Sequence, residues 1–460
     1  MKKEKTESNN FTIQPQSQVP IGQFTEDAYI RFSGYCNCCR VLPDFWGMKP
    51  SYKRLLQAAL CFPKGQAIHT NELVGKMSQW HPHGLTGVDD VVRCFTKKGI
   101  RFNQNGIPYR GPSVFWGKGN FGQVFISGEV SPAAANRYTS TRLSDEFSEI
   151  IGNLWKEVPQ VESPGGAMEP HHIPLPIPLC LMLSESVMGI GVGMRTNIPS
   201  FSPQSMYAAY MKNDPTLLES NINLILDKKK SDLKSLWEKG RGNIVYSYYL
   251  SRVKSDDGKA DGILFSGDTG MGTINFNKKI NKWIEEGKVV SDNVSDQSGP
   301  KLLLSRVPNS RGISIDDLAA ECEKICRVTI KAELSVTDGN SGFVVPLYNW
   351  LDFVYKDYIG LLQKVNQKKI EAVKFEIDIQ KALPIVVDYI MNINPKAENS
   401  EIEKKLNLSK EIVSNVMSKP ISYLRKNKDT TLRQKELKDK LAELKKFDPA
   451  LFTYSVIQKL

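Results

Sequence analysis

Residues 133–139 contain a tyrosine whose neighbours could make it a nucleophile. They read Ala-Ala-Ala-Asn-Arg-Tyr-Thr, so Tyr138 follows a run of small residues and stands directly after Arg137. A phenol has a pKa near ~10 and attacks poorly until cations stabilise its oxyanion. Arg137 and His83 are the candidate cations. Because the chain has 16 tyrosines, Tyr138 taken alone is more readily explained as an ordinary packed or exposed residue.

A predicted helix that starts at Pro50 combines an apolar stripe with three cations. Proline suits the first position of a helix, and the apolar stripe over residues 52–59 takes one face. The other face is left for solvent or phosphates, and a solvated charged face is the ordinary explanation. The three cations are Lys49, Lys53 and Arg54.

Residues 81–84, His-Pro-His-Gly, join two short predicted helices in the outline of a helix-turn-helix. His81 and His83 could ligate a metal, lie in an ordinary loop or hydrogen-bond a phosphate. The helix that follows begins near Thr86 and places valines at helical spacing on one face.

A glycine-rich segment, residues 117–122, reads Gly-Lys-Gly-Asn-Phe-Gly and lets the backbone around Lys118 approach a ligand closely. The sequence differs from a nucleotide-binding P-loop. Five residues rather than four separate Gly111 from Gly117, and Gly119 stands where Ser or Thr should bind the metal. An NTPase is therefore not predicted.

Composition favours a polyanionic partner. The 460 residues carry a formal net charge of +11, which fits nucleic acid first and an anionic membrane surface second. No apolar run approaches the roughly 20 residues that span a bilayer, and the N-terminus lacks an apolar signal core. A cytoplasmic protein with no membrane partner is expected. The eight cysteines fit that compartment as reduced thiols, and no second CxxC completes a zinc site near Cys36, Cys38 and Cys39.

The pattern along the chain predicts four regions and an α+β multidomain fold. Residues 1–25 are polar and predict a flexible arm, and 26–150 predict short amphipathic helices. Residues 151–345 mix helices with strand-like stretches at 242–253, 302–307 and 327–334.

Residues 346–460 predict two long helices. Pro384 is expected to end or kink the first of them. The second carries Leu437, Leu441 and Leu444 at matching spacing, which favours an antiparallel coiled-coil hairpin over two surface helices of a bundle. The heptad positions of the first helix are Leu347, Leu351, Val354, Tyr358, Leu361, Val365, Ala372, Phe375, Ile379, Ala382 and Val386.

The order and spacing of these motifs resemble the A subunit of bacterial gyrase and topoisomerase IV, which are type IIA DNA topoisomerases. The size resembles the separate medium subunit of T-even-type phage topoisomerases. A fifth segment agrees: Glu169-Pro170, two Ile-Pro pairs, and Gly189-Ile190-Gly191-Val192-Gly193. The motifs cover residues 35–200, and the likeness continues to the C-terminus by architecture.

The resemblance implies a winged-helix DNA-cleavage domain (26–150), an α/β tower domain (151–345), and a long antiparallel coiled coil with a small helical dimer gate (346–460). It implies that Tyr138 forms a 5′-phosphotyrosyl bond, with Arg137 as its transition-state partner and Arg40 at the scissile phosphate. Ile190 matches an apolar wedge that bends the duplex. Residues matching family positions around the cut DNA are His81, His83, Lys49, Lys53, Arg54 and Lys118, and Thr86 and Asp90 match drug-contact positions.

Three departures from the family pattern are visible. One residue is missing between Asp44 and Lys49, Leu85 replaces a frequent Asp, and Ser184 and Glu185 stand where Asn-Gly is expected. The change at Leu85 casts doubt on drug binding.

The reaction implied is a transient double-strand break, passage of a second duplex, and resealing, giving relaxation and decatenation. No acidic metal cluster or ATPase motif is recognisable, so Mg²⁺ and ATP are expected on a separate B-type subunit, with this chain as a homodimer inside a heterotetramer. Because the sequence ends at Leu460 without a wrapping segment, no net negative supercoiling is expected. The alternatives are a tyrosine recombinase or nickase and a non-enzymatic helix-turn-helix DNA-binding protein.

Overall fold

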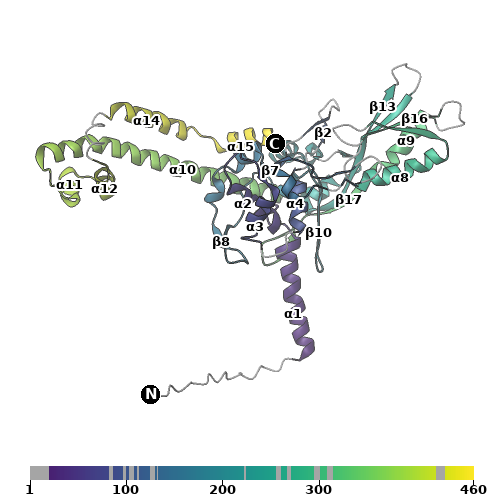
Figure 1. The fold of residues 1–460 in the computed structure, drawn as a ribbon, viewed down its shortest axis with the longest axis horizontal. Coiled ribbons are helices and arrows are strands. Elements are labelled where there is room, and N and C mark those ends of the chain that lie inside the picture. The colour runs from purple at the N-terminus through teal and green to yellow at the C-terminus, as the bar shows by residue number, and fades with distance from the viewer. Residues whose placement is uncertain are drawn as a thin grey trace.

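The structure is a computed structural model. It describes residues 20–81, 86–96, 100–102, 108–110, 113–124, 130–131, 133–221, 224–254, 261–266, 271–294, 301–307, 314–420 and 430–460. Within these ranges helices and strands are mixed, which confirms the α+β prediction at that level. A central body carries a long helical arm on one side, a large sheet on the other, and a single projecting helix (Figure 1).

The central body packs three short helices against a three-stranded antiparallel sheet in the order β1-β7-β4. The helices begin and end close to where their apolar periodicity predicts, and their stripes meet in one core with Leu55, Met77 and Phe95 completely buried. The elements are α2 (Pro50–Leu60), α3 (Thr70–Met77), α4 (Thr86–Thr96), β1 (Ile68–His69), β4 (Phe115–Lys118) and β7 (Ser140–Leu143).

Smaller elements surround this core. A helix, α5 (Asp145–Ile151), follows β7 and is capped by the Ser144 side chain. Three two-stranded ribbons are β2 (Ile100–Phe102) with β3 (Pro108–Arg110), β5 (Gln123–Val124) with β6 (Val130–Ser131), and β8 (Gln160–Glu162) with β9 (Met168–Pro170).

The second lobe is an eight-stranded sheet with the path β10-β11-β17-β13-β14-β16-β15 and β12 beside β13. The three predicted strand stretches are confirmed as β13 (Arg241–Lys254), β16 (Lys301–Arg306) and β17 (Arg327–Glu333). The other strands are β10 (Val187–Ile190), β11 (Arg195–Ile198), β12 (Leu224–Leu226), β14 (Asp261–Ser266) and β15 (Val289–Asn293); β18 (Ser335–Thr337) and β19 (Gly342–Val344) form a separate ribbon. The helices of this region are α6 (Pro203–Lys212), α7 (Leu233–Lys239), α8 (Met271–Glu285) and α9 (Ile315–Ile325).

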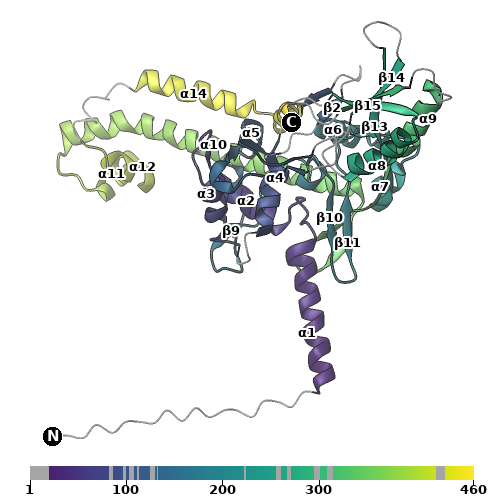
Figure 2. The ribbon, with the colours of Figure 1, turned by 45° about the vertical axis from the view of Figure 1, so that its right-hand side comes forward.

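The helical arm is built on α10 (Leu347–Asp388), a 42-residue helix that continues past Pro384. Figures 1 and 2 show α10 and α14 (Thr431–Lys445) running side by side away from the body, with α11 (Asn399–Leu406) and α12 (Lys410–Met417) at the far end. The chain returns through α14 to α15 (Pro449–Lys459) on the body.

The predicted heptad positions are buried from Leu347 to Tyr358 and again at Ile379, Ala382 and Val386, but the register is wrong in the middle of α10. Ala372 and Phe375 are exposed, whereas Val373 and Ile377 are buried against Leu437 of α14. Beyond them, α10 packs Ile379, Leu383, Val386 and Val387 against α11 and α12 instead. Because the partner changes along the helix, a single repeat cannot describe which face is covered.

The arm is attached to the body by side chains at the start of α10. Trp46 Nε1 donates to Asp357 Oδ2 at 2.9 Å, and the Tyr358 hydroxyl donates to the Ile150 carbonyl at 2.8 Å. Trp46 also stacks on His172, with ring centroids 3.7 Å apart. These contacts fix the start of α10 on α5 and on the loop that precedes α2.

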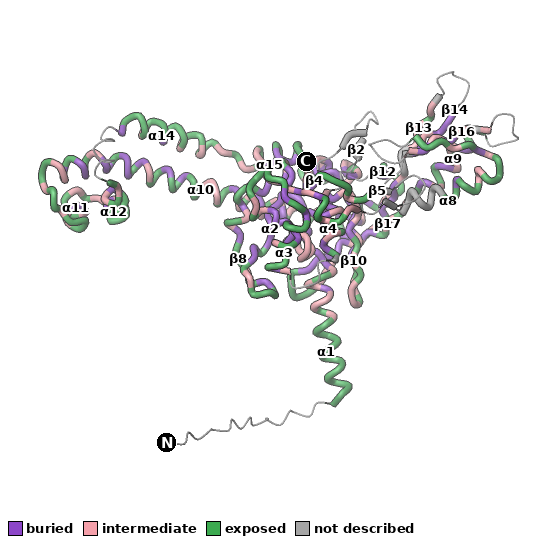
Figure 3. Tube along the Cα trace, viewed as in Figure 1, coloured by how far each residue is buried: buried purple, intermediate pink, exposed green. Residues whose placement is uncertain are grey.

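The helix α1 (Ile21–Cys36) extends from the body with no buried residue, as Figure 3 shows by its colour. The prediction of a flexible arm to residue 25 is wrong for residues 21–25, which are helical; residues 1–19 lie outside the described ranges. Within the described ranges, no helix combines the length and apolar character that a bilayer crossing requires.

Candidate functional site

Tyr138 lies at the end of a 3₁₀ turn, Asn136–Tyr138, with its side chain turned to the surface. The residue is 68% exposed, which is unusual for a large aromatic residue and leaves the hydroxyl accessible to a macromolecule. The Arg137 guanidinium carbon lies 4.6 Å from the centre of the Tyr138 ring. The cation therefore lies over the face of the tyrosine ring.

Contacts on both sides of Tyr138 fix its backbone. Asn136 Nδ2 donates to Asp89 Oδ1 on α4 at 2.6 Å. On the other side, the Thr139 hydroxyl donates to the Thr70 hydroxyl at 2.7 Å, and the Thr70 amide donates to the Thr139 carbonyl at 3.0 Å. Tyr138 is therefore an exposed side chain on a rigid support, the arrangement that a nucleophile needs.

The glycine-rich segment supports this same turn. Gly119 has φ +110°, and a Cβ there would lie 3.1 Å from the Tyr138 carbonyl oxygen. The Asn120 carbonyl accepts a hydrogen bond from the Ala134 amide at 3.0 Å. Lys118 pairs with Ser140 in the β4–β7 register and is exposed. The glycines let this segment pass close to the tyrosine, which explains them without any phosphate-binding loop.

Arg40 lies on a short π-helix, Asn37–Val41, and its guanidinium carbon is 5.2 Å from the Tyr35 ring centre. It lines a pocket of about 430 Å³ together with His81 and the first turns of α2 and α4. Helix N-termini carry partial positive charge, so two of them beside an arginine favour a phosphate. The described lining does not include Arg137 or Tyr138.

Ile190 stands at the end of β10 and is 86% exposed. The hairpin formed by β10 and β11 is bonded to the body in two places. The Asn37 side-chain amide makes two bonds with Val192, donating to its carbonyl and accepting from its amide, both at 2.9 Å. Lys49 Nζ donates to the Met188 carbonyl at 2.7 Å. An exposed apolar side chain on a fixed hairpin is suited to inserting between base pairs.

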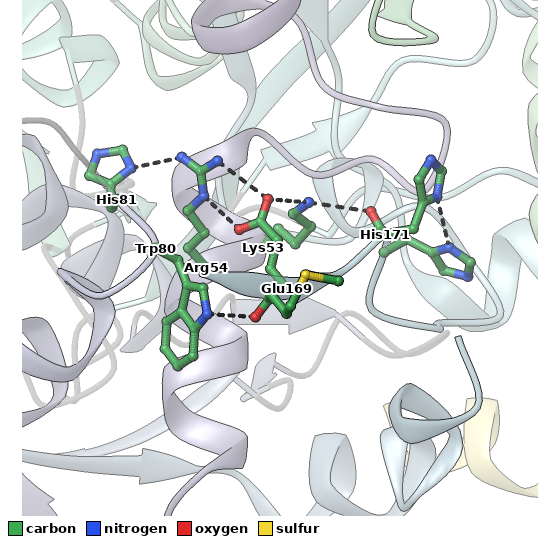
Figure 4. Close-up of polar contacts among 8 residues, drawn as sticks. Lys53, Arg54, Trp80, His81, Glu169 and His171 are labelled. Atoms are coloured by element: carbon green, nitrogen blue, oxygen red, sulfur yellow. Dashed lines mark hydrogen bonds and ion pairs between the residues drawn. The ribbon is translucent and has the colours of Figure 1, made fainter. Parts of the chain in front are cut away.

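The sequence left Lys49, Lys53 and Arg54 for solvent or phosphates, but in the structure the Lys53 and Arg54 side chains are largely buried in ion pairs. Lys49 is half-buried against the β10–β11 hairpin, and this burial lowers its pKa. Lys53 Nζ lies 2.9 Å from Glu169 Oε1, and Arg54 Nε lies 2.8 Å from Glu169 Oε2. Arg54 is only 5% exposed. The face opposite the apolar stripe of α2 is covered by β9, so its cations are paired internally (Figure 4).

The other predicted residues are placed as follows. His81 contacts Arg54, with Nδ1 3.4 Å from Nη1. His83 and Leu85 lie outside the described residues. Thr86 begins α4, and Asp90 is exposed and accepts a hydrogen bond from Arg93 at 3.0 Å. Within the described part of the chain, no three His, Cys, Asp or Glu side chains gather as a potential metal site.

Asp44 is expected to make the free energy of unfolding depend on pH. Its Oδ1 accepts the Trp46 and Met48 amides, both at 2.9 Å, but burial dominates and raises its pKa from 3.8 to about 6. Lys53 and His172 oppose this shift. The folded chain therefore holds the proton more tightly than the unfolded chain, so this contribution is fully present below pH 3.8 and is lost as pH rises through 6.

We expect Asp44→Asn, whose amide oxygen can keep both backbone bonds, to flatten this dependence. Between about pH 4 and about pH 6, the free energy of unfolding of the wild type should fall by roughly 1–3 kcal/mol relative to the variant. Denaturant titrations at several pH values measure it. Parallel curves for the two proteins would contradict the prediction.

Comparison with known proteins identifies the family. Residues 40–458 match the family model of the A subunit of DNA gyrase/topoisomerase IV. The chain belongs to this family. The match begins at Arg40 and includes Tyr138, Ile190 and α10, so the family spans all three lobes described above.

Similar proteins include the A subunit of DNA topoisomerase 4 from Haemophilus influenzae, 25% identical over 95% of this chain and 59% of the relative. The A subunit of DNA gyrase from Buchnera aphidicola is 29% identical over 54% of this chain and 30% of the relative. The A subunit of DNA topoisomerase 4 from Rickettsia conorii is 23% identical over 88% and 57%. The chain thus spans less than two thirds of the length of these family members.

Two residues of the site were given no role from the sequence. Glu169 was part of a motif, and its position at the start of an apolar, proline-rich segment was the available signal that it would be buried and paired with a cation. Asn37 carried no such signal, because its partner Val192 is 155 residues away.

Proposed function

We propose that this chain is the DNA-cleavage and religation subunit of an ATP-dependent type IIA DNA topoisomerase. The observation that carries the proposal is Tyr138, a highly exposed tyrosine on a rigid turn with Arg137 against its ring, in a chain of the gyrase/topoisomerase IV A family. The three helices and the β1-β7-β4 sheet serve as its winged-helix domain, the eight-stranded sheet as the tower, and α10 to α14 as the coiled coil with a helical dimer gate.

The reaction is a reversible transesterification. The Tyr138 oxygen attacks a backbone phosphorus of duplex DNA, a 5′-phosphotyrosyl bond forms, and the 3′-oxygen leaves and takes up a proton. Arg137 stabilises the developing phenolate, and Arg40 holds the phosphate oxygens. Religation reverses each step, and because the ester keeps the bond energy, resealing needs no added nucleotide.

Bending of the duplex is assigned to Ile190. Its exposure and the ties from Asn37 and Lys49 to its hairpin support this role. Contact with the DNA phosphates is assigned to His81 and, from its match to the family motif, to His83, and Thr86 and Asp90 remain candidate drug contacts. Lys118 is an exposed cation near the Tyr138 turn.

The complete enzyme is proposed to be a heterotetramer of two copies of this chain and two of a B-type subunit that binds ATP and Mg²⁺. When bound, Mg²⁺ stabilises charge on the phosphate and the leaving oxygen. The similar proteins are bacterial, which supports placing the reaction in the bacterial cytoplasm. Relaxation and decatenation by passage of a second duplex are the expected outcomes.

The test is to combine this chain with its B-type subunit, plasmid, Mg²⁺ and ATP, and to trap cleaved DNA with detergent. We expect peptide mapping to find DNA linked through its 5′ end to Tyr138. The chain alone should bind DNA, with affinity falling steeply as salt rises, and should neither cleave efficiently nor hydrolyse ATP. Linkage at another residue, or robust ATP-dependent relaxation by the chain alone, would contradict the proposal.

A further inference from the structure

Glu169 is a buried carboxylate that holds two cations of α2 at once. It is 3% exposed and lies on β9, which packs against α2. Arg54 binds it with two nitrogens, Nε at 2.8 Å and Nη2 at 3.3 Å, and Lys53 Nζ lies 2.9 Å from Oε1. A buried charge is tolerated only when it is paired in this way, and a two-pronged pair also fixes the plane of the guanidinium.

The third nitrogen of this guanidinium contacts His81. Arg54 Nη1 lies 3.4 Å from His81 Nδ1. A guanidinium has only N–H donors, so Nδ1 must accept and cannot carry a proton. The His81 ring is therefore neutral and carries its proton on Nε2. Figure 4 shows the row Glu169, Arg54, His81, in which each partner orients the next.

The same ribbon also holds the residue before His81. Trp80 Nε1 donates to the Met168 carbonyl at 2.8 Å, one residue before Glu169. His81 is thus linked to two neighbouring residues of β9 indirectly: its ring contacts Arg54, which binds Glu169, and the preceding residue, Trp80, binds Met168. His81 in turn lines the pocket that contains Arg40.

We propose that Glu169 is a positioning residue for DNA cleavage: through Arg54 it fixes His81 as a neutral ring with its proton on Nε2, the tautomer in which Nε2 can donate to a phosphate of the bound DNA. This inference rests on the proposed function. It assigns Lys53 and Arg54 to the support of the site rather than to direct contact with the phosphates. In other proteins, the hydrogen-bond partner of one histidine ring nitrogen sets which nitrogen carries the proton. Here that partner is Arg54, and Glu169 holds Arg54 in place.

The deciding measurement is the tautomer of His81 by NMR of the full chain with ¹⁵N-labelled histidine rings. The chain has five histidines, and His81→Gln assigns the relevant signal. The wild type should show a protonated Nε2 and an unprotonated Nδ1. Arg54→Lys keeps the buried charge but lacks the nitrogen that reaches His81. The signal of a single His81 tautomer should therefore be lost. Lys53→Met is the matched control, because it removes the other cation of Glu169 and should leave the pattern unchanged.

A second measurement separates positioning from simple support of the fold. In the assembled enzyme, Glu169→Gln should lower the yield of covalent complex roughly 10- to 100-fold, by analogy with the loss of residues that orient metal-bound histidines. DNA affinity and its salt dependence should stay unchanged. If the variant instead released Lys53 or Arg54 to bind DNA, each new phosphate contact would steepen the slope of log affinity against log salt by about 0.9.

Three outcomes would overturn the proposal: an unchanged His81 tautomer in Arg54→Lys, full cleavage by a folded Glu169→Gln protein, or tighter DNA binding with a steeper salt slope in that variant. If Glu169→Gln does not fold, the Arg54→Lys spectrum decides alone. Failure of the proposed function is distinguishable, because it would appear as DNA attached away from Tyr138, whereas the tautomer is measured without any cleavage.

Discussion

Tyr138→Phe is expected to abolish DNA cleavage while leaving the fold and DNA affinity nearly unchanged. The substitution removes only the hydroxyl of an exposed side chain, so no buried partner loses a contact. The ring that lies against Arg137 is kept. Loss of a covalent nucleophile removes the bond-making atom itself, and a decrease of at least about 10³-fold in covalent complex is expected.

The measurement is the yield of detergent-trapped complex with both subunits, Mg²⁺ and ATP, together with DNA binding by the chain alone. Tyr454→Phe is the matched control, since Tyr454 is also an exposed tyrosine, at 46%, but lies on α15. The control should cleave normally. Persisting cleavage by the Tyr138 variant would show that another residue attacks the DNA.

Ile190→Ala is expected to have the second largest effect, a loss of DNA bending with a parallel loss of cleavage. An inserted side chain offsets the few kcal/mol needed to unstack a base step. If the shortened side chain forfeits roughly 2 kcal/mol of that compensation, cleavage falls about 30-fold. The protein should remain folded, because Ile190 is 86% exposed and contributes little to the core.

Bending is measured by fluorescence transfer between the ends of a short duplex bound to the chain. Leu432→Ala provides the control, because Leu432 is an equally solvent-facing residue, 73% exposed, on α14. It removes a similar apolar side chain away from the hairpin. Unchanged bending with Ile190→Ala would remove the wedge role from the proposed mechanism without affecting the role of Tyr138.

The sequence predicted the local elements well because each is specified by residues a few positions apart. The apolar stripe of α2 and its proline at the first position defined that helix. The long apolar periodicity after residue 346 predicted α10, and the strand-like stretches predicted β13, β16 and β17. Helical and extended repeats are short-range properties and need no knowledge of what packs against them.

The middle of α10 shows where this reasoning stops. A regular repeat after residue 368 predicted Ala372 and Phe375 at the interface, but Val373 and Ile377 are the residues buried against α14. The helix was predicted correctly, and its covered face was predicted wrongly only in this middle stretch. Which face is buried depends on where α14, α11 and α12 lie, and those positions are set by packing between distant segments.

At the site, the reactive groups could be read from the residues alone, namely Tyr138 beside Arg137, and an apolar Ile190 between glycines. Which charges are available to a ligand depends on the packing of distant segments. Arg54 and Glu169 are 115 residues apart, and they meet because β9 covers the polar face of α2. Burial there excludes water and makes pairing obligatory, so cations that a helical pattern assigns to solvent become internal supports.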